Sequence, residues 1–325
     1  MRKTVLKVLL GIAACVLGFI VVVWLIWIPS AKEPGYVFVS AWGAPGSAPG
    51  QFNDPTGIAV TRTEVFVSDA RNARIQVFDF DGRFKREFGT KGDAPSQLGR
   101  PMNLSIAGNE LYVADYWNDR VQVFALDGTP RRVIGSPGSG NGEFNAPGGV
   151  AVARNGDLFV ADFYNQRVQH LRADGSFVKQ WGKTRETGVS AGQFIYPTDV
   201  ALAGDGTLYV ADGYADRVQV FSSAGPFLRK WGGPFAINIF GPFNSWFATV
   251  TGITVDHEGN VFVADFYNNR IQKFTADGQF VTAFGERGSE LGQFNKAIAV
   301  AVASDGTVFT VDYGNNRIQK WQPTR

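Results

Sequence analysis

Six segments of the chain share one alternation of apolar and polar positions. Each has an apolar run that ends in Asp, a short turn, and a second apolar run that begins with Arg. They read VFVSDARNARIQVF (65–78), LYVADYWNDRVQVF (111–124), LFVADFYNQRVQHL (158–171), LYVADGYADRVQVF (208–221), VFVADFYNNRIQKF (261–274) and VFTVDYGNNRIQKW (308–321). The aspartates recur every 46–53 residues, and an Arg follows each by five positions. A fixed period of this length indicates a repeat architecture.

Each repeat is expected to form four strands. A short run of small residues, such as 57–60 or 149–152, precedes the run that ends in Asp. The run that begins with Arg is followed by an Asp-Gly turn, as at 81–82 or 277–278, and by a last run that closes in Phe-Gly or Trp-Gly. Asp-Gly between alternating apolar runs is a strong hairpin signal. Four-stranded antiparallel units at this spacing predict an all-β, six-bladed β-propeller.

The two ends of the repeat region predict how the ring closes. The sixth repeat stops at its third strand, near Trp321, while residues 36–43 (YVFVSAWG) match the fourth strand of the other repeats. We therefore expect the N-terminal strand to complete the last blade, which removes an open sheet edge. The predicted propeller domain spans residues 36–325.

The N-terminal pattern is different, because residues 8–28 form an uncharged apolar run of 21 residues. At about 1.5 Å per residue, a helix of this length spans roughly 30 Å, the thickness of a bilayer's hydrocarbon core. We therefore predict a cytoplasmic tip and transmembrane anchor over residues 1–28 and a short linker over residues 29–35. Two alternatives remain open: a cleaved signal peptide, and lipid attachment at Cys15 in a lipobox-like Ile-Ala-Ala-Cys.

The charges around this segment predict its orientation. Arg2, Lys3 and Lys7 lie on one side, and Trp24 and Trp27 lie near the other end, where indoles favour the interface. The positive-inside rule then places the N-terminus in the cytoplasm and the propeller outside. The expectation is a single-pass protein of the inner (cell) membrane with a periplasmic propeller, in contact with the lipid bilayer through residues 8–28.

Composition narrows the possible functions. The formal charge is +2, from 31 basic and 29 acidic residues. Without the three N-terminal cations the balance is 28 against 29, or −1, and a near-neutral body argues against an electrostatic nucleic-acid binder. The apolar content of 45% excludes a disordered chain, and the single Cys excludes a disulfide-stapled scaffold.

The repeated pattern V-A-D-x-x-N-x-R-I-Q-V-F, with G-x-F-x-x-P before the first strand, resembles the NHL repeat family of six-bladed propellers. The resemblance covers roughly residues 36–322 and suggests a membrane-anchored bacterial type. It implies a fold but no single function, because members include protein-binding and RNA-binding domains, extracellular sensor domains and a peptide-amidating lyase. We expect the repeated aspartates to accept loop N–H groups and the arginines to pair with carboxylates.

The lyase and lactonase activities that the resemblance implies as alternatives find little support in the residues of this chain. The lyase-type zinc site needs several histidines, and this chain has only His170 and His257, on different elements. A calcium-dependent lactonase-type site needs a carboxylate cluster in the channel mouth, but the six equivalent positions hold one acid, Asp199. We predict no catalytic residue, no cofactor and no metal; a lyase or hydrolase is the less favoured alternative.

A first candidate binding surface is the set of aromatic residues that follow the repeated aspartates. Exposed Tyr and Trp are favoured in interfaces because they bury a large area with little loss of rotamer freedom. The alternative is that the rings pack between neighbouring blades. The residues are Tyr116, Trp117, Phe163, Tyr164, Tyr214, Phe266, Tyr267 and Tyr313.

A second candidate is the long connection that enters the fifth repeat. Residues 233–251 replace the usual G-x-F-x-x-P, contain an insertion and carry no charge. So many apolar groups are unusual in a surface loop and predict a docking element for a membrane partner or the bilayer surface; the alternative is a plug folded over the channel mouth. The predicted contact residues are Phe235, Ile237, Ile239, Phe240, Phe243, Trp246 and Phe247.

Together these features predict a non-catalytic protein-interaction scaffold or an accessory subunit of a membrane complex. The expected partners are other membrane proteins, as in a respiratory or photosynthetic-type complex, and no nucleic acid. A propeller that senses or binds a peptide or carbohydrate ligand is the alternative, and the aromatic positions would then form its site.

Overall fold

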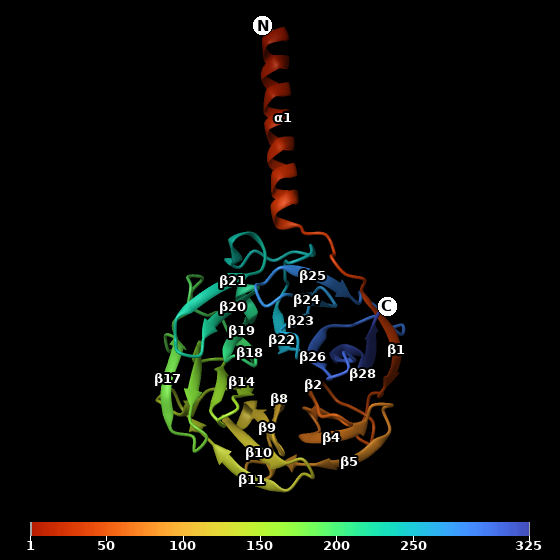
Figure 1. The fold of residues 1–325 in the computed structure, drawn as a ribbon, viewed down its shortest axis with the longest axis vertical. Coiled ribbons are helices and arrows are strands. Elements are labelled where there is room, and N and C mark those ends of the chain that lie inside the picture. Colours follow the sequence, from red (N-terminus) through yellow and green to blue (C-terminus); the bar gives the residue numbers. More distant parts are fainter. Residues whose placement is uncertain (1, 325) are drawn as a thin grey trace.

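Six four-stranded antiparallel sheets stand around a central axis like the blades of a propeller (Figure 1). The computed structural model describes residues 2–324; within the N-terminal helix α1 (Arg2–Trp27) it describes the side chains of Val5 and of residues 7–22. The predicted all-β six-bladed propeller is therefore confirmed.

Each blade uses its strands in the same radial order. The innermost strands are β2 (Pro55–Val60), β8 (Pro101–Ala107), β14 (Pro147–Val152), β18 (Pro197–Leu202), β22 (Val250–Val255) and β26 (Ala297–Val302). The second strands are β3 (Glu64–Asp69), β9 (Glu110–Asp115), β15 (Leu158–Asp162), β19 (Thr207–Asp212), β23 (Val261–Asp265) and β27 (Val308–Asp312). The third strands are β4 (Arg74–Asp79), β10 (Arg120–Ala125), β16 (Arg167–Leu171), β20 (Arg217–Ser222), β24 (Arg270–Phe274) and β28 (Arg317–Pro323). The outer strands are β5 (Phe84–Phe88), β11 (Pro130–Ile134), β17 (Phe177–Gly182), β21 (Phe227–Trp231), β25 (Phe280–Phe284) and, from the N-terminus, β1 (Tyr36–Trp42).

Short elements decorate one face of the disc, which we call the loop face. It carries the turns between second and third strands and the long connections between blades. Two connections contain short parallel pairs, β6 (Thr90–Lys91) with β7 (Gln97–Leu98) and β12 (Ser136–Pro137) with β13 (Glu143–Phe144). The 3-10 turns are η1 (Tyr116–Asn118), η2 (Gly213–Ala215), η3 (Pro234–Ala236) and η4 (Tyr313–Asn315).

The hydrophobic core lies between blades. Alternate residues of each strand face the neighbouring sheet, so every pair of adjacent blades encloses its own buried cluster. Between the fourth and fifth blades, for example, Val218 and Trp231 pack against Phe247 and Phe274. The interface between the last and first blades has an equivalent cluster that includes Phe309 and Phe52. Each blade is therefore stabilised mainly by its two neighbours.

The ring closes as the sequence predicts. Strand β1 pairs antiparallel with β28, with Tyr36 opposite Pro323 and Trp42 opposite Ile318, and becomes the outer strand of the last blade. The two strands run side by side in Figure 1 although they come from opposite ends of the chain. Phe38 adds an edge-to-face contact with Trp321 at 5.8 Å between ring centroids.

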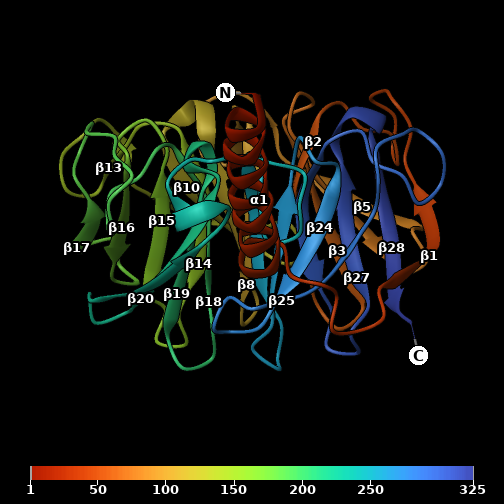
Figure 2. The same ribbon diagram turned by 90° about the horizontal axis from the view of Figure 1, so that it is seen from above.

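The structure does not support the predicted membrane anchor. Helix α1 projects from the edge of the disc, and its described side chains are exposed (Figures 1 and 2). Within the described part of the chain, no helix combines the length and the apolar character needed to cross a bilayer. The predicted transmembrane helix is therefore wrong, and so is the single-pass inner-membrane protein with a periplasmic propeller; the flanking side chains of Arg2, Lys3, Trp24 and Trp27 lie outside the described ones.

The predicted linker of residues 29–35 is packed against the fifth blade. The Lys32 amide donates a hydrogen bond to the Val281 carbonyl at 2.8 Å, and Glu33 forms an ion pair with Lys273 at 2.8 Å. The segment therefore runs along the outer edge of this blade before it enters β1.

Candidate functional site: an aromatic mouth above the central channel

One polar network, repeated in all six blades, fixes the loop face. In the first blade, Asp69 at the end of β3 accepts hydrogen bonds from the backbone N–H of Asn53 (2.7 Å) and from the side chains of Asn72 (2.9 Å), Arg74 (2.8 Å) and Gln76 (3.1 Å). The equivalent aspartates 115, 162, 212, 265 and 312 pair with Arg120, Arg167, Arg217, Arg270 and Arg317. The predicted structural role of both residue types is confirmed.

Burial changes the protonation equilibrium of these carboxyl groups. Loss of solvation raises the pKa of Asp212 and of Asp265 to about 6, while the neighbouring arginine acts in the opposite direction. Each carboxylate is saturated with donors that hold two loops together. These groups therefore build the frame on which the site rests.

The predicted aromatic residues meet around the opening of the central channel on the loop face. Phe163 contacts Tyr116, Tyr164 and Tyr214 at centroid distances of 6.0, 5.0 and 6.1 Å. A second group joins Phe266 to Tyr267 at 4.9 Å and to Tyr313 at 6.1 Å. We call these rings, together with Trp117 and Tyr196, the aromatic mouth.

The mouth encloses a real cavity. Rings from four blades line a space of about 280 Å³: Tyr116, Phe163, Tyr214, Phe266 and Tyr267. Trp117 and Tyr267 are still 56% and 59% exposed, so much of the aromatic surface remains open to a partner. The rings therefore pack on one another and also leave surface exposed, and their use as a binding surface stays a prediction.

The sequence reasoning missed the residues that directly precede the innermost strands. Tyr196 lies before β18 and contacts Phe163 at 4.9 Å and Tyr214 at 5.3 Å, which links these rings into one cluster. Its φ of 54° is left-handed, as it is at Asp54 and Lys296 in other blades. Comparison of the residues just before each innermost strand would have revealed this second ring of variable side chains.

Two of these preceding residues add positive charge to the mouth. Arg100 places its guanidinium 5.5 Å from the Trp117 ring centre, and Lys296 places its ammonium 5.6 Å from that of Phe266. Asp54 lies 4.0 Å from Arg100 and also pairs with Arg71. Burial is the main cause that raises the pKa of Tyr116, Tyr214 and Tyr313, so these phenols stay protonated at neutral pH.

The predicted docking element of residues 233–251 reaches the mouth only at its end, where Thr249 and Thr251 line the cavity. Its residues 233–248, which we call the blade-5 loop, lie away from the mouth. This loop runs along the outer edge of the disc, where the Asn244 side chain donates a hydrogen bond to the Pro29 carbonyl at 2.9 Å (Figure 1). The residues that line the channel include none from 233–248. The loop is therefore not the plug that the sequence left open as an alternative.

The predicted contact residues of this loop divide into two groups. Phe235 and Phe240 are 68% and 72% exposed, and Ile237, Ile239 and Phe243 are also exposed. Trp246 is partly buried against Phe243, with 5.1 Å between ring centroids. Phe247 is fully buried in the core between the fourth and fifth blades, so its inclusion as a contact residue is wrong. It takes the core position that Phe52 holds in the first blade.

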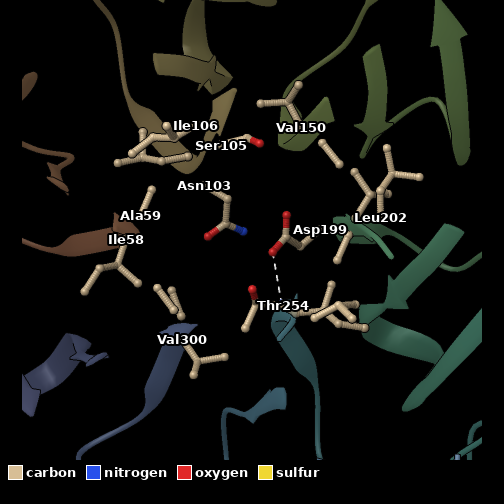
Figure 3. A pocket seen from close by; sticks show the side chains of 18 of the residues that line it. Ile58, Ala59, Asn103, Ser105, Ile106, Val150, Asp199, Leu202, Thr254 and Val300 are labelled. Atoms are coloured by element: carbon tan, nitrogen blue, oxygen red, sulfur yellow. Dashed lines mark hydrogen bonds between the residues drawn. The ribbon is translucent and has the colours of Figure 1, made fainter. Parts of the chain in front are cut away.

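Below the mouth, the innermost strands enclose the central channel, a cavity of about 330 Å³ (Figure 3). Most of its side chains are aliphatic, but Asn103 and Asp199 project into the central space from β8 and β18. The Ile253 N–H donates to Asp199 Oδ2 at 3.0 Å. Burial raises the pKa of Asp199 to about 8.

The two histidines are placed apart. His170 on β16 stacks on Phe159 and bonds through Nε2 to Asp157 at 2.8 Å. His257 lies in the turn between β22 and β23, on the face opposite the mouth. The structure thus does not bring them together, as expected from their positions in the repeats.

Fold and site together define a six-bladed β-propeller with a ligand-sized opening on its loop face. The NHL repeat model matches residues 52–78, 144–171, 194–221, 247–274 and 294–321. The chain is thus a six-bladed propeller in which five segments match the NHL repeat, and its second blade has the same strand order and the same polar network.

Similar proteins share single repeats or the fold. Protein brain tumor from Drosophila melanogaster is 40% identical over 58 residues, which is 18% of this chain and 6% of that protein. The virginiamycin B lyase structure from Staphylococcus aureus has a TM-score of 0.56 at 15% identity, over 90% of this chain and 89% of that one. The gluconolactonase XC5397 from Xanthomonas campestris has a TM-score of 0.62 at 13% identity, over 91% and 98%. At such identities the two structures establish a common fold alone.

Proposed function

We propose that this protein is a non-catalytic binding propeller that holds a segment of a partner protein across the aromatic mouth. The observation that carries this proposal is the convergence of rings from separate blades around one opening. Aromatic residues are over-represented among the residues that dominate binding energies at protein interfaces. The mouth offers them on a frame that the Asp–Arg pairs keep rigid, so little order would be lost on binding.

Binding rather than catalysis is also favoured by how the acidic groups are used. The six aspartates at the ends of the second strands are each engaged by a loop amide and an arginine. Lyase and lactonase activities belong to the structural neighbours named above. We therefore propose a scaffold role for this chain, with a peptide segment of another protein as the bound group.

A second surface supports the scaffold role. The exposed rings of Phe235, Phe240 and Phe243 form an uncharged patch at the outer edge, beside the segment that leads from α1. Exposed apolar clusters of this kind mark interaction sites. This blade-5 patch is the second candidate docking surface, distinct from the mouth.

The two surfaces can be separated by mutation. Peptides selected from a phage-displayed random library on the full chain would be titrated against the wild type, Trp117→Ala/Tyr267→Ala and the matched control Phe235→Ser/Phe240→Ser. We expect the mouth variant to lose at least about tenfold in affinity, because removal of a well-placed ring costs roughly 1–2 kcal/mol. The loop variant should bind like the wild type.

The opposite pattern would contradict the proposal. If the selected peptides bind the mouth variant with unchanged affinity and lose affinity for the loop variant, the blade-5 patch is the docking site. A selection that yields no peptide specific for this chain would also count against a peptide-binding mouth. Circular dichroism and thermal unfolding of both variants show whether the frame is intact.

A further inference from the structure

The starting point is a carboxyl group that the fold does not require. Asp199 occupies the second layer of the channel, and the equivalent positions in the other five blades are Gly57, Asn103, Gly149, Gly252 and Ala299. A buried carboxyl group without a cationic partner costs free energy. Among the described residues that line the channel there is no Lys, Arg or His. Asp199 is therefore a candidate ligand-binding group.

The neighbouring blade is shaped around this side chain. A Cβ atom at Gly149 would lie 2.0 Å from Asp199 Oδ1 and 2.9 Å from the Asp199 Cα atom. Any side chain at position 149 would therefore displace the carboxyl group. The glycine on β14 and the acid on β18 fit together, and the carboxyl group is directed into the channel (Figure 3).

A second polar group faces the same space. The carboxamide of Asn103 comes from β8, is 9% exposed, and has no hydrogen-bond partner in the described part of the chain. The hydroxyl of Thr254, from β22, is directed into the channel as well. Asn103 is buried and Thr254 is half-buried, so their polar atoms are available to a group bound in the channel. Three strands thus present oxygen acceptors to one small volume.

The route to these groups passes through the aromatic mouth. Asn103 lines both the mouth cavity and the channel, so the two spaces meet at its side chain. Ring faces carry negative electrostatic potential and attract cations. The two cations nearest the mouth, Arg100 and Lys296, already lie over the rings of Trp117 and Phe266. The faces of Tyr116, Phe163 and Tyr214 remain on the path inward.

We propose that the channel beneath the aromatic mouth binds a primary ammonium group on an alkyl chain, with Asp199 as its counter-ion and Asn103 and Thr254 as further hydrogen-bond acceptors. A primary ammonium carries three N–H donors, which these acceptors can satisfy, and its single charge equals that of one carboxylate. A divalent metal would keep an uncompensated charge in a buried place. The aliphatic side chains around the polar groups suit the methylene stem.

This inference deepens the proposed function. It rests on that function for the molecule that carries the ammonium group, a lysine of the bound partner segment. A lysine side chain of the bound segment would reach from the mouth to Asp199, which lies about one strand residue, or 3.4 Å, below the layer of Met102. A free alkylamine would offer the same chemistry. Asp199 is the titratable group of the channel lining. The titratable and charged groups of the mouth are Arg100, Lys296, Asp54, Tyr116, Tyr164, Tyr196, Tyr214, Tyr267 and Tyr313.

Ammonium binding should release a proton. The raised pKa of Asp199 means that its carboxyl group is mostly protonated at pH 7 when the channel holds no cation. An incoming ammonium stabilises the carboxylate, so the carboxyl proton leaves to the buffer while the ammonium keeps its own three protons. A purely structural role of Asp199 would not produce this linkage.

The test uses the full chain and n-butylamine as the probe, at constant ionic strength. Calorimetric titration at pH 7 in phosphate and in HEPES, neither of which contains a primary amine, gives the affinity and, from the difference in heat, the number of protons released. The matched probes are n-butanol, which has the stem without the charge, and calcium chloride. We expect butylamine to bind with release of close to one proton, Asp199→Asn to weaken binding at least tenfold and abolish the release, and both matched probes to give no saturable heat.

Three results of these titrations would overturn the proposed ammonium site. Equal butylamine binding by the wild type and Asp199→Asn, equal binding of n-butanol, or binding of calcium in place of the amine would each do so. If Asp199→Asn fails to fold, Asp199→Gly, which copies three other blades, and Thr254→Val replace it.

Further measurements distinguish a lysine side chain from a free amine as the ligand, and they test the ammonium site separately from the peptide-binding mouth. Nα-acetyl-lysine methylamide binding more tightly than butylamine indicates a lysine side chain, and the reverse order indicates a free amine. Selected peptides that bind through the mouth but show no dependence on Asp199 refute the ammonium site alone. Peptides that ignore the mouth rings refute the proposed function, whatever butylamine does.

Discussion

At the scale of single residues, buried aspartates occupy two different environments in this propeller. The aspartates that end the second strands are buried but saturated by an arginine and by loop amides, as Asp69 is by Arg74 and Asn53. Asp199 is buried to a similar degree and has backbone N–H donors only. A pair of opposite charges can repay much of its desolvation, whereas a lone carboxyl group cannot. The paired aspartates stabilise the loops around the mouth, whereas the unpaired Asp199 marks the proposed ammonium site.

This contrast predicts how stability depends on pH. A folded-state pKa of about 8 for Asp199 lies above the unfolded value of 3.8, so its contribution is fully present below pH 4 and is lost as the pH rises through 8. The loss amounts to at most about 6 kcal/mol, at 1.36 kcal/mol for each pKa unit. Asp199→Asn cannot ionise and should escape it.

Urea unfolding of both proteins between pH 5 and pH 9, without amine, measures this effect. The free energy of unfolding of the wild type should fall relative to that of the variant as the pH rises. Parallel curves would show that Asp199 is not the group responsible.

At the scale of elements, strand β1 decides whether six repeats make a closed ring. It supplies the outer strand of the last blade, and Tyr36 and Phe38 pack against the cluster between the fifth and sixth blades. Without it, β28 would be an open sheet edge with an uncovered apolar surface. The helix that precedes β1 makes no such contribution, because its described side chains are exposed.

Two truncations separate these contributions. A chain of residues 29–325 should unfold at the temperature of the full chain, whereas a chain of residues 43–325 should unfold at least about 10 °C lower and aggregate, since it loses a strand and its ring contacts. Scanning fluorimetry with light scattering measures both properties. Equal unfolding temperatures for the two truncations would contradict strand closure.

Some of these elements could be predicted from the sequence and others could not. Blade number, strand order and closure were predictable because each repeat carries the same alternation, Asp-Gly turns and Asp–Arg spacing. The predicted membrane helix was wrong because it was inferred from an uncharged apolar run alone, and no helix in the described part of the chain combines the length and the apolar character to cross a bilayer. Phe247 was misplaced because apolar residues of an inserted loop and a core position of the repeat look alike without an alignment of the blades. Tyr196 was missed because the residues before the innermost strands were not compared between repeats. Its contacts with Phe163 and Tyr214 depend on how the blades come together in space.

At the scale of the whole molecule, circular closure brings variable positions of successive repeats to one opening. Each blade contributes only one or two rings, and a single repeat could not form a binding surface. The mouth joins rings that lie far apart in the sequence, such as Tyr116 and Phe266, around one cavity. The blade-5 patch, by contrast, belongs to one loop at the edge. The central claim is that partner binding uses the shared opening.

Hydrogen-exchange mass spectrometry of the full chain with a selected peptide tests that claim most directly. The account predicts slower amide exchange in the turns 116–118, 163–166, 213–216 and 266–269 and in the connections that precede β8 and β18, with residues 233–243 unchanged. Backbone amides at a contact surface lose access to solvent, and several blades should respond together. Protection confined to residues 233–243, or to the turns of the opposite face, would contradict it.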